Sequence, residues 1–318
     1  MTNHVKSEAS PNLIPHLVGR DHEIQQIRAC IQAGRNILLE GPVGVGKTHL
    51  ALSVTAELGT PVFRIDGDSR YSEQKLSGWF DPPTVIKKGF TAETFMPGPL
   101  VEAMRKGGVL FINELNRLPE GVQNVLLPAI DERMIVIPRL GEVRAAEGFL
   151  VVATQNPKEF VATSHLSEAI LDRFELVVLD YQDEEQETEI VTERLKTGTA
   201  LKATNKKSAQ DLPKEVKYLP LAAVRLIRMT RNHPRIRRGA SVRAALSIAE
   251  IADVMIRGRN SFQDAFISAA LLALPTRIEI EREADSEKSI RVEMESLIQE
   301  WAETVLAELE AGSVKKKT

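Results

Sequence analysis

The chain has 318 residues, of which 43% are hydrophobic and 27% charged, and its formal net charge is −3. These values are those of an ordinary globular protein, and they exclude a chain whose whole surface attracts nucleic acid or anionic membranes. The single cysteine, Cys30, excludes an internal disulfide and suits a reducing compartment.

The N-terminal segment gives the expected location. Its first residues, MTNHVKSEASPN, lack the apolar core of a signal peptide. No run in the chain approaches the roughly 18 apolar residues that a membrane-spanning helix needs. We therefore expect a cytoplasmic protein without membrane insertion, in which residues 1–15 form a flexible N-terminal lead-in.

A helical stretch at residues 20–34 is followed by apolar runs separated by helical stretches. The apolar runs are continuous rather than alternating, which predicts strands of a parallel sheet covered on both faces. The sequence therefore predicts an α/β domain over residues 16–182 with a parallel five-stranded sheet flanked by helices. The five predicted strands lie at residues 36–40, 61–66, 109–113, 150–156 and 175–180.

The remainder of the chain is predicted to be helical. Residues 183–217 are charged and poor in aromatic residues, and we expect a linker with a helix at its start and a mobile loop in its middle. Residues 218–283 have helical apolar spacing, which predicts a small all-α domain. Residues 284–318 contain a C-terminal amphipathic helix and a basic tail. The apolar face of that helix either packs on its own domain or binds a partner.

A glycine-rich stretch, GPVGVGKT, follows the first predicted strand and precedes a helix. It matches the G-x-x-x-x-G-K-[ST] pattern, in which glycines let backbone N–H groups turn toward phosphates. We expect Lys47 to contact the β and γ phosphates of ATP and the Thr48 hydroxyl to bind Mg²⁺. The residues expected to bind the nucleotide are Gly41, Pro42, Val43, Gly44, Val45, Gly46, Lys47 and Thr48.

The strand at residues 109–113 is expected to run beside the first strand and to end at the same edge of the sheet. Glu114 would then lie near the γ phosphate, where its carboxylate can polarise an attacking water. The preceding residue usually supplies a carboxylate to hydrated Mg²⁺, but here it is Asn113. An amide oxygen carries no negative charge, so we expect Asn113 and Thr48 to bind Mg²⁺ more weakly, with water activation retained.

Taken together, these segments resemble the MoxR family of AAA+ ATPases. The resemblance implies an AAA+ core with a small helical lid, bound ATP and Mg²⁺, and assembly into a homo-oligomeric ring, expected to be a hexamer. Besides the glycine-rich stretch, it rests on VLFINELNRLPEGVQNVLLPAIDERMIVI, FLVVATQNPKEF, LSEAILDRFELVV and RRGASVRAAL.

The resemblance also implies catalytic roles. Asn156 corresponds to sensor 1, which orients the attacking water together with Glu114. Arg173 corresponds to an arginine finger that reaches the ATP of a neighbouring subunit. Arg243 corresponds to sensor 2 on the helical domain, with Ser241 as the expected N-cap of its helix. Without the resemblance, Asn156 could form a turn instead, and Arg173 could form an ion pair with Asp172 or a near neighbour.

Further segments match less specific parts of the family. Gly19 and Arg20 lie where an N-terminal strip would pass the adenine. Residues 76–100 and 133–149 resemble two inserts of the wider group that includes MoxR, a loop or hairpin that faces the pore and a hairpin before sensor 1. Aromatic residues of the first insert could bind a client or pack on the core. Pro128 is expected to kink the helix that contains it.

The function implied by the resemblance is ATP-driven remodelling, maturation or activation of a protein complex, with a partner chain that carries a von Willebrand factor A (VWA) domain. Two alternatives are a nucleic-acid motor and an ATP-binding switch that does not hydrolyse, because of Asn113. The basic cluster at residues 228–239 contains no Phe, Tyr or Trp for base stacking, so nucleic acid is not expected as a partner.

Overall fold

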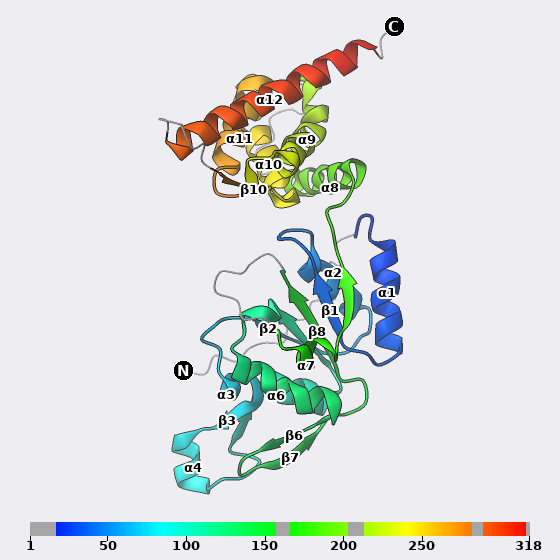
Figure 1. Cartoon of the computed structure of the whole chain (residues 1–318), viewed down its shortest axis with the longest axis vertical. Coiled ribbons are helices and arrows are strands. Elements are labelled where there is room, and N and C mark those ends of the chain that lie inside the picture. The colour runs from blue at the N-terminus through cyan, green and yellow to red at the C-terminus, as the bar shows by residue number, and fades with distance from the viewer. Residues whose placement is uncertain (1–16, 157–165, 203–212, 282–288, 316–318) are drawn as a thin grey trace. The chain divides into compact units, whose positions relative to one another are not determined.

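The structure is a computed structural model that describes residues 17–156, 166–202, 213–281 and 289–315 (Figure 1). The chain divides into two compact units, Met1–Asp180 and Tyr181–Thr318, called here the core unit and the helical unit. The expected lead-in, most of the expected mobile loop and the end of the basic tail lie outside the described residues. In the described part of the chain, no helix combines the length and apolarity that a membrane-spanning segment needs.

The core unit is built on a parallel five-stranded sheet with the order β2-β5-β8-β1-β9. Its three inner strands consist almost entirely of buried residues, which explains their continuous apolarity. The predicted sheet is therefore confirmed. The strands are β1 (Ile37–Glu40), β2 (Val62–Asp66), β5 (Val109–Asn113), β8 (Leu150–Gln155) and β9 (Glu175–Val178).

One expected neighbour relation was wrong. Strand β5 does not run beside β1, because β8 lies between them: Val152 is paired with Ile37 on one side and with Phe111 on the other. On its far side β5 pairs with β2, and Asp66 is the register partner of Asn113. Since all the strands are parallel, their carboxyl ends still meet at one edge of the sheet.

Helices flank this sheet (Figure 1). Helix α2 starts directly after the glycine-rich stretch, and α6 continues through Pro128 without ending there. The helices of the core unit are α1 (Asp21–Gln32), α2 (Lys47–Ala56), α3 (Glu73–Ser77), α4 (Pro82–Lys88), α5 (Pro99–Lys106), α6 (Glu120–Asp131) and α7 (Glu168–Leu171), with the 3-10 turn η1 (Leu115–Arg117).

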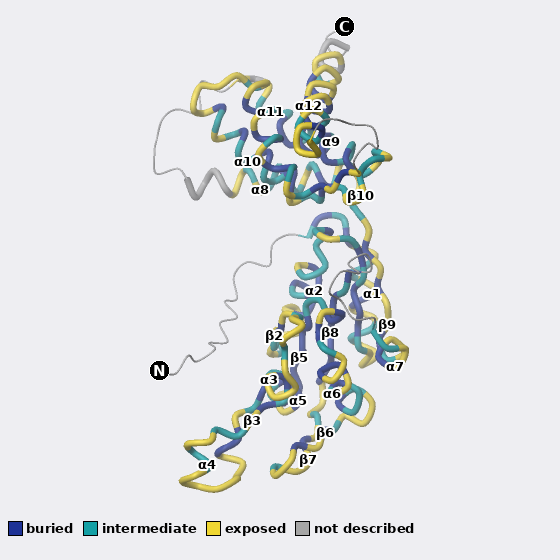
Figure 2. Tube along the Cα trace, turned by 60° about the vertical axis from the view of Figure 1, so that its left-hand side comes forward, coloured by how far each residue is buried: buried dark blue, intermediate teal, exposed yellow. Residues whose placement is uncertain are grey.

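Both expected inserts contain hairpins. Strands β3 (Gly78–Phe80) and β4 (Phe95–Pro97) are antiparallel and enclose α4, and β6 (Met134–Ile137) is antiparallel to β7 (Gly141–Arg144). The two hairpins lie side by side at one end of the core unit (Figures 1 and 2), where the Arg139 guanidinium is 4.0 Å from the centre of the Phe90 ring.

The aromatic residues of the first insert divide into two groups. Phe95 is buried and packs edge-on against Phe80, with ring centres 5.2 Å apart. Trp79 and Phe90 remain 45% and 44% exposed. Core packing is therefore found for Phe95, and a client-binding role for the exposed aromatics stays a prediction.

In the described part of the helical unit, five α-helices share one core. Val191 of α8 is fully buried in that core, so the helix at the start of the expected linker belongs to the helical unit. The apolar face of α12 packs on its own unit through Ile298, Trp301 and Val305. The elements are α8 (Glu184–Lys202), η2 (Lys214–Tyr218), α9 (Leu219–Asn232), β10 (Ile236–Arg238), α10 (Val242–Arg257), α11 (Phe262–Ala273), β11 (Glu279–Ile280) and α12 (Ile290–Lys315).

Candidate functional site

The glycine-rich loop joins the end of β1 to the start of α2. Gly44 and Gly46 have φ angles of 81° and 92°, in the left-handed region that glycine adopts without steric cost. At Gly41 a Cβ atom would stand 2.2 Å from the carbonyl oxygen of Leu179, just after β9. The sheet edge and the loop therefore approach so closely that a larger side chain does not fit.

Lys47 is the first residue of α2, and its side chain turns back over the loop. Its Nζ donates to the carbonyl oxygens of Gly41 at 2.7 Å and Pro42 at 2.8 Å. The ammonium group thus lies within the glycine-rich turn, at the N-terminal end of a helix whose dipole also favours negative charge. A cation in a glycine-rich turn at a helix N-terminus suits a phosphate group.

Arg20, at the start of α1, ties the loop to the end of the core unit. The buried guanidinium donates to the carbonyl oxygens of Val45 at 3.3 Å and Asp180 at 2.7 Å. It also pairs with Glu23 at 2.7 Å. The preceding Gly19 has a φ of 61°. The residues expected beside the adenine are thus adjacent to the phosphate loop, and Arg20 braces that loop.

The end of β5 contacts the start of α2 through Asn113. The Thr48 hydroxyl donates to Oδ1 of Asn113 at 2.8 Å, and the buried Thr154 hydroxyl of β8 donates to the same oxygen at 3.1 Å. On the other side, Nδ2 of Asn113 donates to Oδ1 of Asp66 at 2.9 Å. Four side chains from three strands and a helix therefore form one hydrogen-bonded group.

Asp66, the last residue of β2, is the exposed member of this hydrogen-bonded group. Its carboxylate also accepts a hydrogen bond from Nη2 of Arg64 at 2.8 Å. That bond, and secondarily the bond from Asn113, hold the pKa of Asp66 below its ordinary value, although partial burial opposes the shift. Asp66 is thus an ionised acceptor at neutral pH.

Glu114 follows β5 in a strained conformation. Its φ and ψ are both 59°, a left-handed geometry that costs a non-glycine residue about 1–3 kcal/mol. The Glu114 N–H donates to Oγ1 of Thr154 at 2.9 Å, and the carboxylate accepts from Nη1 of Arg117 at 2.7 Å. A Cβ on Gly67 would lie 2.1 Å from the Glu114 carbonyl oxygen. Close packing and hydrogen bonds together hold this backbone in place.

Asn156, the expected sensor 1, is buried directly after β8. Its carbonyl oxygen accepts from Nδ2 of Asn116 at 3.4 Å, which links the end of β8 to the turn after β5. The fold therefore brings Asn156 to the sheet edge that carries Asn113.

Arg173, the expected arginine finger, lies just after α7 and is occupied within its own chain. Its Nε donates to Oδ2 of Asp131 at 2.6 Å, and Nη1 donates to the carbonyl oxygen of Ala169. Among the described residues, the polar contacts of Arg173 are with these two and not with the phosphate loop. Arg173 thus forms an ion pair within its own chain, but its partner is Asp131, which is 42 residues away in sequence and is not the expected near neighbour.

Arg243, the expected sensor 2, is an exposed residue in the first turn of α10, in the helical unit. Ser241 occupies the N-cap position as expected, but its side chain makes no capping hydrogen bond. The roles of Arg243 and of a lid remain predictions.

The basic cluster of the helical unit is largely engaged in ion pairs. Arg228 and Arg231 pair with Glu187 at 3.1 Å and 2.8 Å, and the Glu187 side chain is 2% exposed. Arg235 pairs with Glu293 at 2.5 Å. Buried carboxylates need such partners, so these arginines serve the fold of the unit.

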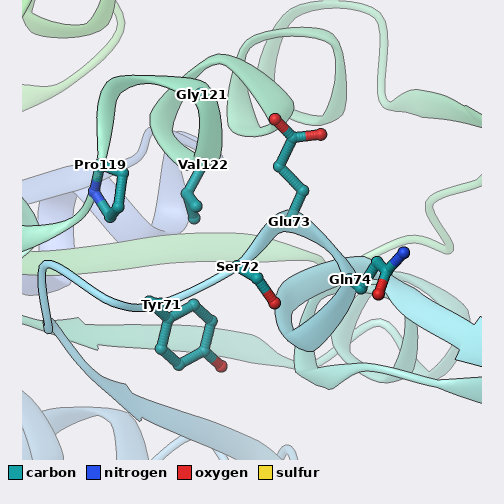
Figure 3. Close-up of a pocket in the computed structure, with 7 residues that line it drawn as sticks. All are labelled: Tyr71, Ser72, Glu73, Gln74, Pro119, Gly121 and Val122. Carbon is teal, nitrogen blue, oxygen red and sulfur yellow. The ribbon is translucent and has the colours of Figure 1, made fainter.

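A separate pocket of about 360 Å³ lies between the start of α3 and the start of α6 (Figure 3). None of the predicted site residues lines it. The lining residues are Tyr71, Ser72, Glu73, Gln74, Pro119, Gly121 and Val122.

Three residues of the site were missed by sequence reasoning: Asp66, Thr154 and Arg117. Thr154 precedes Asn156 by two positions in the predicted strand, so the period of a strand could have placed the two side chains together. Asp66 ends a predicted strand, and the rule that parallel strands end at one edge could have identified it. Arg117 has no comparable signal, because its contact with Glu114 depends on the turn after β5.

The oxygens at this edge fit a divalent cation that is bound together with phosphates. A hydroxyl and an amide carbonyl, those of Thr48 and Asn113, are hard ligands of the kind that Mg²⁺ accepts. Within the described ranges, no group of three or more His, Cys, Asp or Glu residues could hold a metal ion. Mg²⁺ commonly uses few protein ligands and completes its shell with phosphates and water.

The comparison with protein families identifies part of the chain. Residues 36–174 match the model of the AAA domain (dynein-related subfamily). Residues 36–174 of the core unit are therefore similar to an AAA domain, and the core unit has the AAA+ fold. This agrees with the predicted core of an AAA+ protein.

Related sequences cover the chain in part. An uncharacterized protein of Staphylococcus haemolyticus is 34% identical over 158 residues, 49% of this chain and 59% of that protein. The match thus spans less than two thirds of that relative. An uncharacterized protein of Staphylococcus epidermidis is 28% identical over 234 residues, 73% of this chain and 83% of that protein.

Among solved structures, a mutant of RuvB from Thermotoga maritima is 18% identical and has a TM-score of 0.52. The match covers 81% of this chain and 72% of that chain. At this identity the likeness concerns the fold alone.

Proposed function

We propose that this AAA-domain chain is a MoxR-like ATPase that couples ATP binding and hydrolysis to remodelling, maturation or activation of a protein complex. The observation that carries the ATPase part is the 2.8 Å hydrogen bond between Thr48 and Asn113. It joins the phosphate loop to the strand end that presents Glu114, so a phosphate group and a catalytic carboxylate can meet.

Each residue of the loop has a role in this proposal. In the proposed ATP complex, the Lys47 ammonium group donates to phosphate oxygens in place of the carbonyl oxygens of Gly41 and Pro42. Phosphate and carbonyl oxygens are both hydrogen-bond acceptors. Thr48 and Asn113 would hold Mg²⁺, which would supply positive charge beside the phosphates. The backbone N–H groups from Gly44 to Thr48 surround the same phosphates.

Glu114 is the proposed base that orients and polarises water, with Asn156 beside it. The carboxylate of Glu114 is paired with Arg117 at 2.7 Å, and it must turn from this arginine to receive a water proton. Thr154 holds the Glu114 backbone N–H, so the carboxylate can move while its backbone remains in place.

Assembly into a homo-oligomeric ring, expected to be a hexamer, completes the proposed site. Arg173 would act on the nucleotide of the next subunit, after release from Asp131. The exposed apolar residues Leu171, Leu176 and Val178 surround Arg173 in sequence and support a contact face there, because exposed apolar surface favours association. Arg243 of the helical unit is the proposed sensor 2.

The client and the VWA-domain partner are proposed to be separate protein chains in the cytoplasm. The two hairpins of the core unit support a client-binding role, because they present several large apolar side chains to solvent. These side chains are Trp79, Ile86, Phe90, Met96 and Val136. The ion pairs of the basic cluster lend no support to a nucleic-acid motor.

An ATP-binding switch without turnover is the second candidate, favoured by the neutral Asn113. The test is ATP turnover by the whole chain across a Mg²⁺ titration, at several protein concentrations, with Glu114→Gln and Lys47→Ala alongside. We expect turnover that rises with protein concentration and is lost in Glu114→Gln, which should still bind ATP. Binding without turnover at all Mg²⁺ concentrations would identify the switch, and absence of nucleotide binding would refute both. Stimulation by DNA would favour the motor.

A further inference from the structure

The amide of Asn113 has a defined orientation, and the charges around it explain why. An ionised carboxylate only accepts hydrogen bonds, whereas a hydroxyl can donate or accept. The NH₂ group of Asn113 must therefore face Asp66, at 2.9 Å, and its carbonyl oxygen must face the hydroxyls of Thr48 and Thr154. The Glu114 N–H already uses Oγ1 of Thr154 as its acceptor, so that hydroxyl is free to donate to Asn113.

The same geometry makes a carboxylate at position 113 unfavourable. An aspartate there would place its oxygen where the Asn113 amide now donates to Asp66, and two ionised carboxylates at that separation repel each other. With Asp66 on β2, an amide on β5 is the partner that forms a hydrogen bond. The pair of Asp66 and Asn113 therefore carries one negative charge. That charge lies on β2, the strand next to β5.

We infer that Asp66 supplies the negative charge of the divalent-cation site, acting through Asn113. Asp66 holds the carbonyl oxygen of Asn113 toward Thr48, and its exposed carboxylate attracts the hydrated cation of the nucleotide. This inference rests on the proposed binding of ATP and Mg²⁺. Asp66 is a positioning residue, because it acts through Asn113 and the water shell.

Arg64 limits the size of this effect. Its guanidinium pairs with Asp66 at 2.8 Å, but both side chains are largely exposed, so the pair is weak and a divalent ion competes with it. A solvent-exposed charge of this kind should change cation affinity about threefold to tenfold.

The test measures Mn²⁺ binding in place of Mg²⁺, by electron paramagnetic resonance, with the whole chain in excess over a non-hydrolysable ATP analogue. Asp66→Asn should weaken Mn²⁺ binding about threefold to tenfold, while its affinity for labelled ADP in EDTA stays unchanged. The double variant Asp66→Asn/Asn113→Asp restores one negative charge to the pair and should regain wild-type Mn²⁺ affinity.

Asp68→Asn is the matched control. Asp68 is an exposed aspartate two residues further on, paired with Arg70 at 3.6 Å, and the same charge change there should leave Mn²⁺ binding as in the wild type. Equal behaviour of Asp66→Asn and Asp68→Asn would overturn the inference, as would a double variant as weak as Asp66→Asn. Thermal midpoints check that all variants fold. If the wild type binds no nucleotide even with Mn²⁺, the proposed function fails and the inference fails with it.

Discussion

Asp131 at the end of α6 accepts a 2.6 Å hydrogen bond from Arg173, so the arginine proposed to act between subunits is paired within its own chain. The contact joins segments that are 42 residues apart in sequence. Both side chains are partly exposed, which makes the pair weak enough to exchange for a phosphate on a neighbouring subunit.

Removing this pair should affect assembly-dependent activity more than stability. In Asp131→Asn, Arg173 keeps its charge and loses its intrachain partner, so half-maximal ATP turnover should occur at lower protein concentration than in the wild type. The free energy of unfolding should fall by no more than about 1 kcal/mol, as expected for an exposed pair. Turnover against protein concentration and urea unfolding measure the two effects.

Asp172→Asn provides the control for that experiment, since Asp172 is the exposed acidic neighbour of Arg173 in the chain. Asp172→Asn also removes one negative charge, but it leaves Asp131 in place as the partner of Arg173. If both variants shift the concentration dependence equally, the Asp131 contact has no special role.

Gly67 controls the position of Glu114. In Gly67→Ala the new Cβ would lie 2.1 Å from the Glu114 carbonyl oxygen, so the backbone after β5 must move. We expect a loss of about 1–3 kcal/mol in the free energy of unfolding and loss of most ATP turnover. Nucleotide binding at the glycine-rich loop should persist, which labelled ADP can report.

Gly258→Ala is the comparison for Gly67→Ala. A Cβ at Gly258 would meet nothing nearer than the Met255 carbonyl oxygen at 3.2 Å, and that glycine lies in the helical unit. This variant should retain turnover. Retained turnover in Gly67→Ala as well would show that the position of Glu114 tolerates displacement.

The single thiol, Cys30, offers a direct measure of pH dependence. Partial burial, together with the negative charge of Glu175, raises its pKa above the ordinary thiol value. The alkylation rate with iodoacetamide should therefore reach half its maximum at a higher pH than for a free cysteine, whose pKa is about 8.5. Glu175→Gln should lower that midpoint, and Glu168→Gln should leave it unchanged.

The sign of the linked stability follows from the same shift. The folded chain binds the thiol proton more tightly than the unfolded chain does, so this contribution to stability is full below the unfolded pKa of Cys30. It is lost as the pH rises through the folded pKa. A midpoint at or below that of free cysteine would contradict the assigned environment of Cys30.

Glu187 is the buried acidic centre of the helical unit. Glu187→Gln would leave Arg228 and Arg231 facing a neutral side chain, with Arg231 itself largely buried. Breaking a buried ion pair on one side costs about 3–5 kcal/mol, which urea unfolding should detect. Glu308→Gln, which removes an exposed partner 3.9 Å from Arg225, should cost less than about 1 kcal/mol. If Glu187→Gln and Glu308→Gln lowered the free energy of unfolding equally, the Glu187 carboxylate would have to be in contact with water.

The parallel sheet and the phosphate loop could be predicted from the amino-acid sequence, because their signals are local. The two hairpins were expected from the resemblance of residues 76–100 and 133–149 to inserts of related proteins. A continuous apolar run indicates a strand that is buried on both faces, as in Val109–Asn113. From Gly41 to Thr48, the glycines indicate the backbone turn of the loop and the lysine supplies its positive charge. The expected roles of Asn156, Arg173 and Arg243 came from family resemblance and stay predictions.

Strand order and side-chain partners could not be predicted in this way, because they depend on which distant segments pack together. The position of β8 between β1 and β5 is set by pairing across the sheet, not by any one strand. Asn113 and Asp66 are 47 residues apart, and their contact exists because two parallel strands pair in a particular register. Only that register places Asp66 of β2 beside Asn113 of β5, the position where an aspartate was expected.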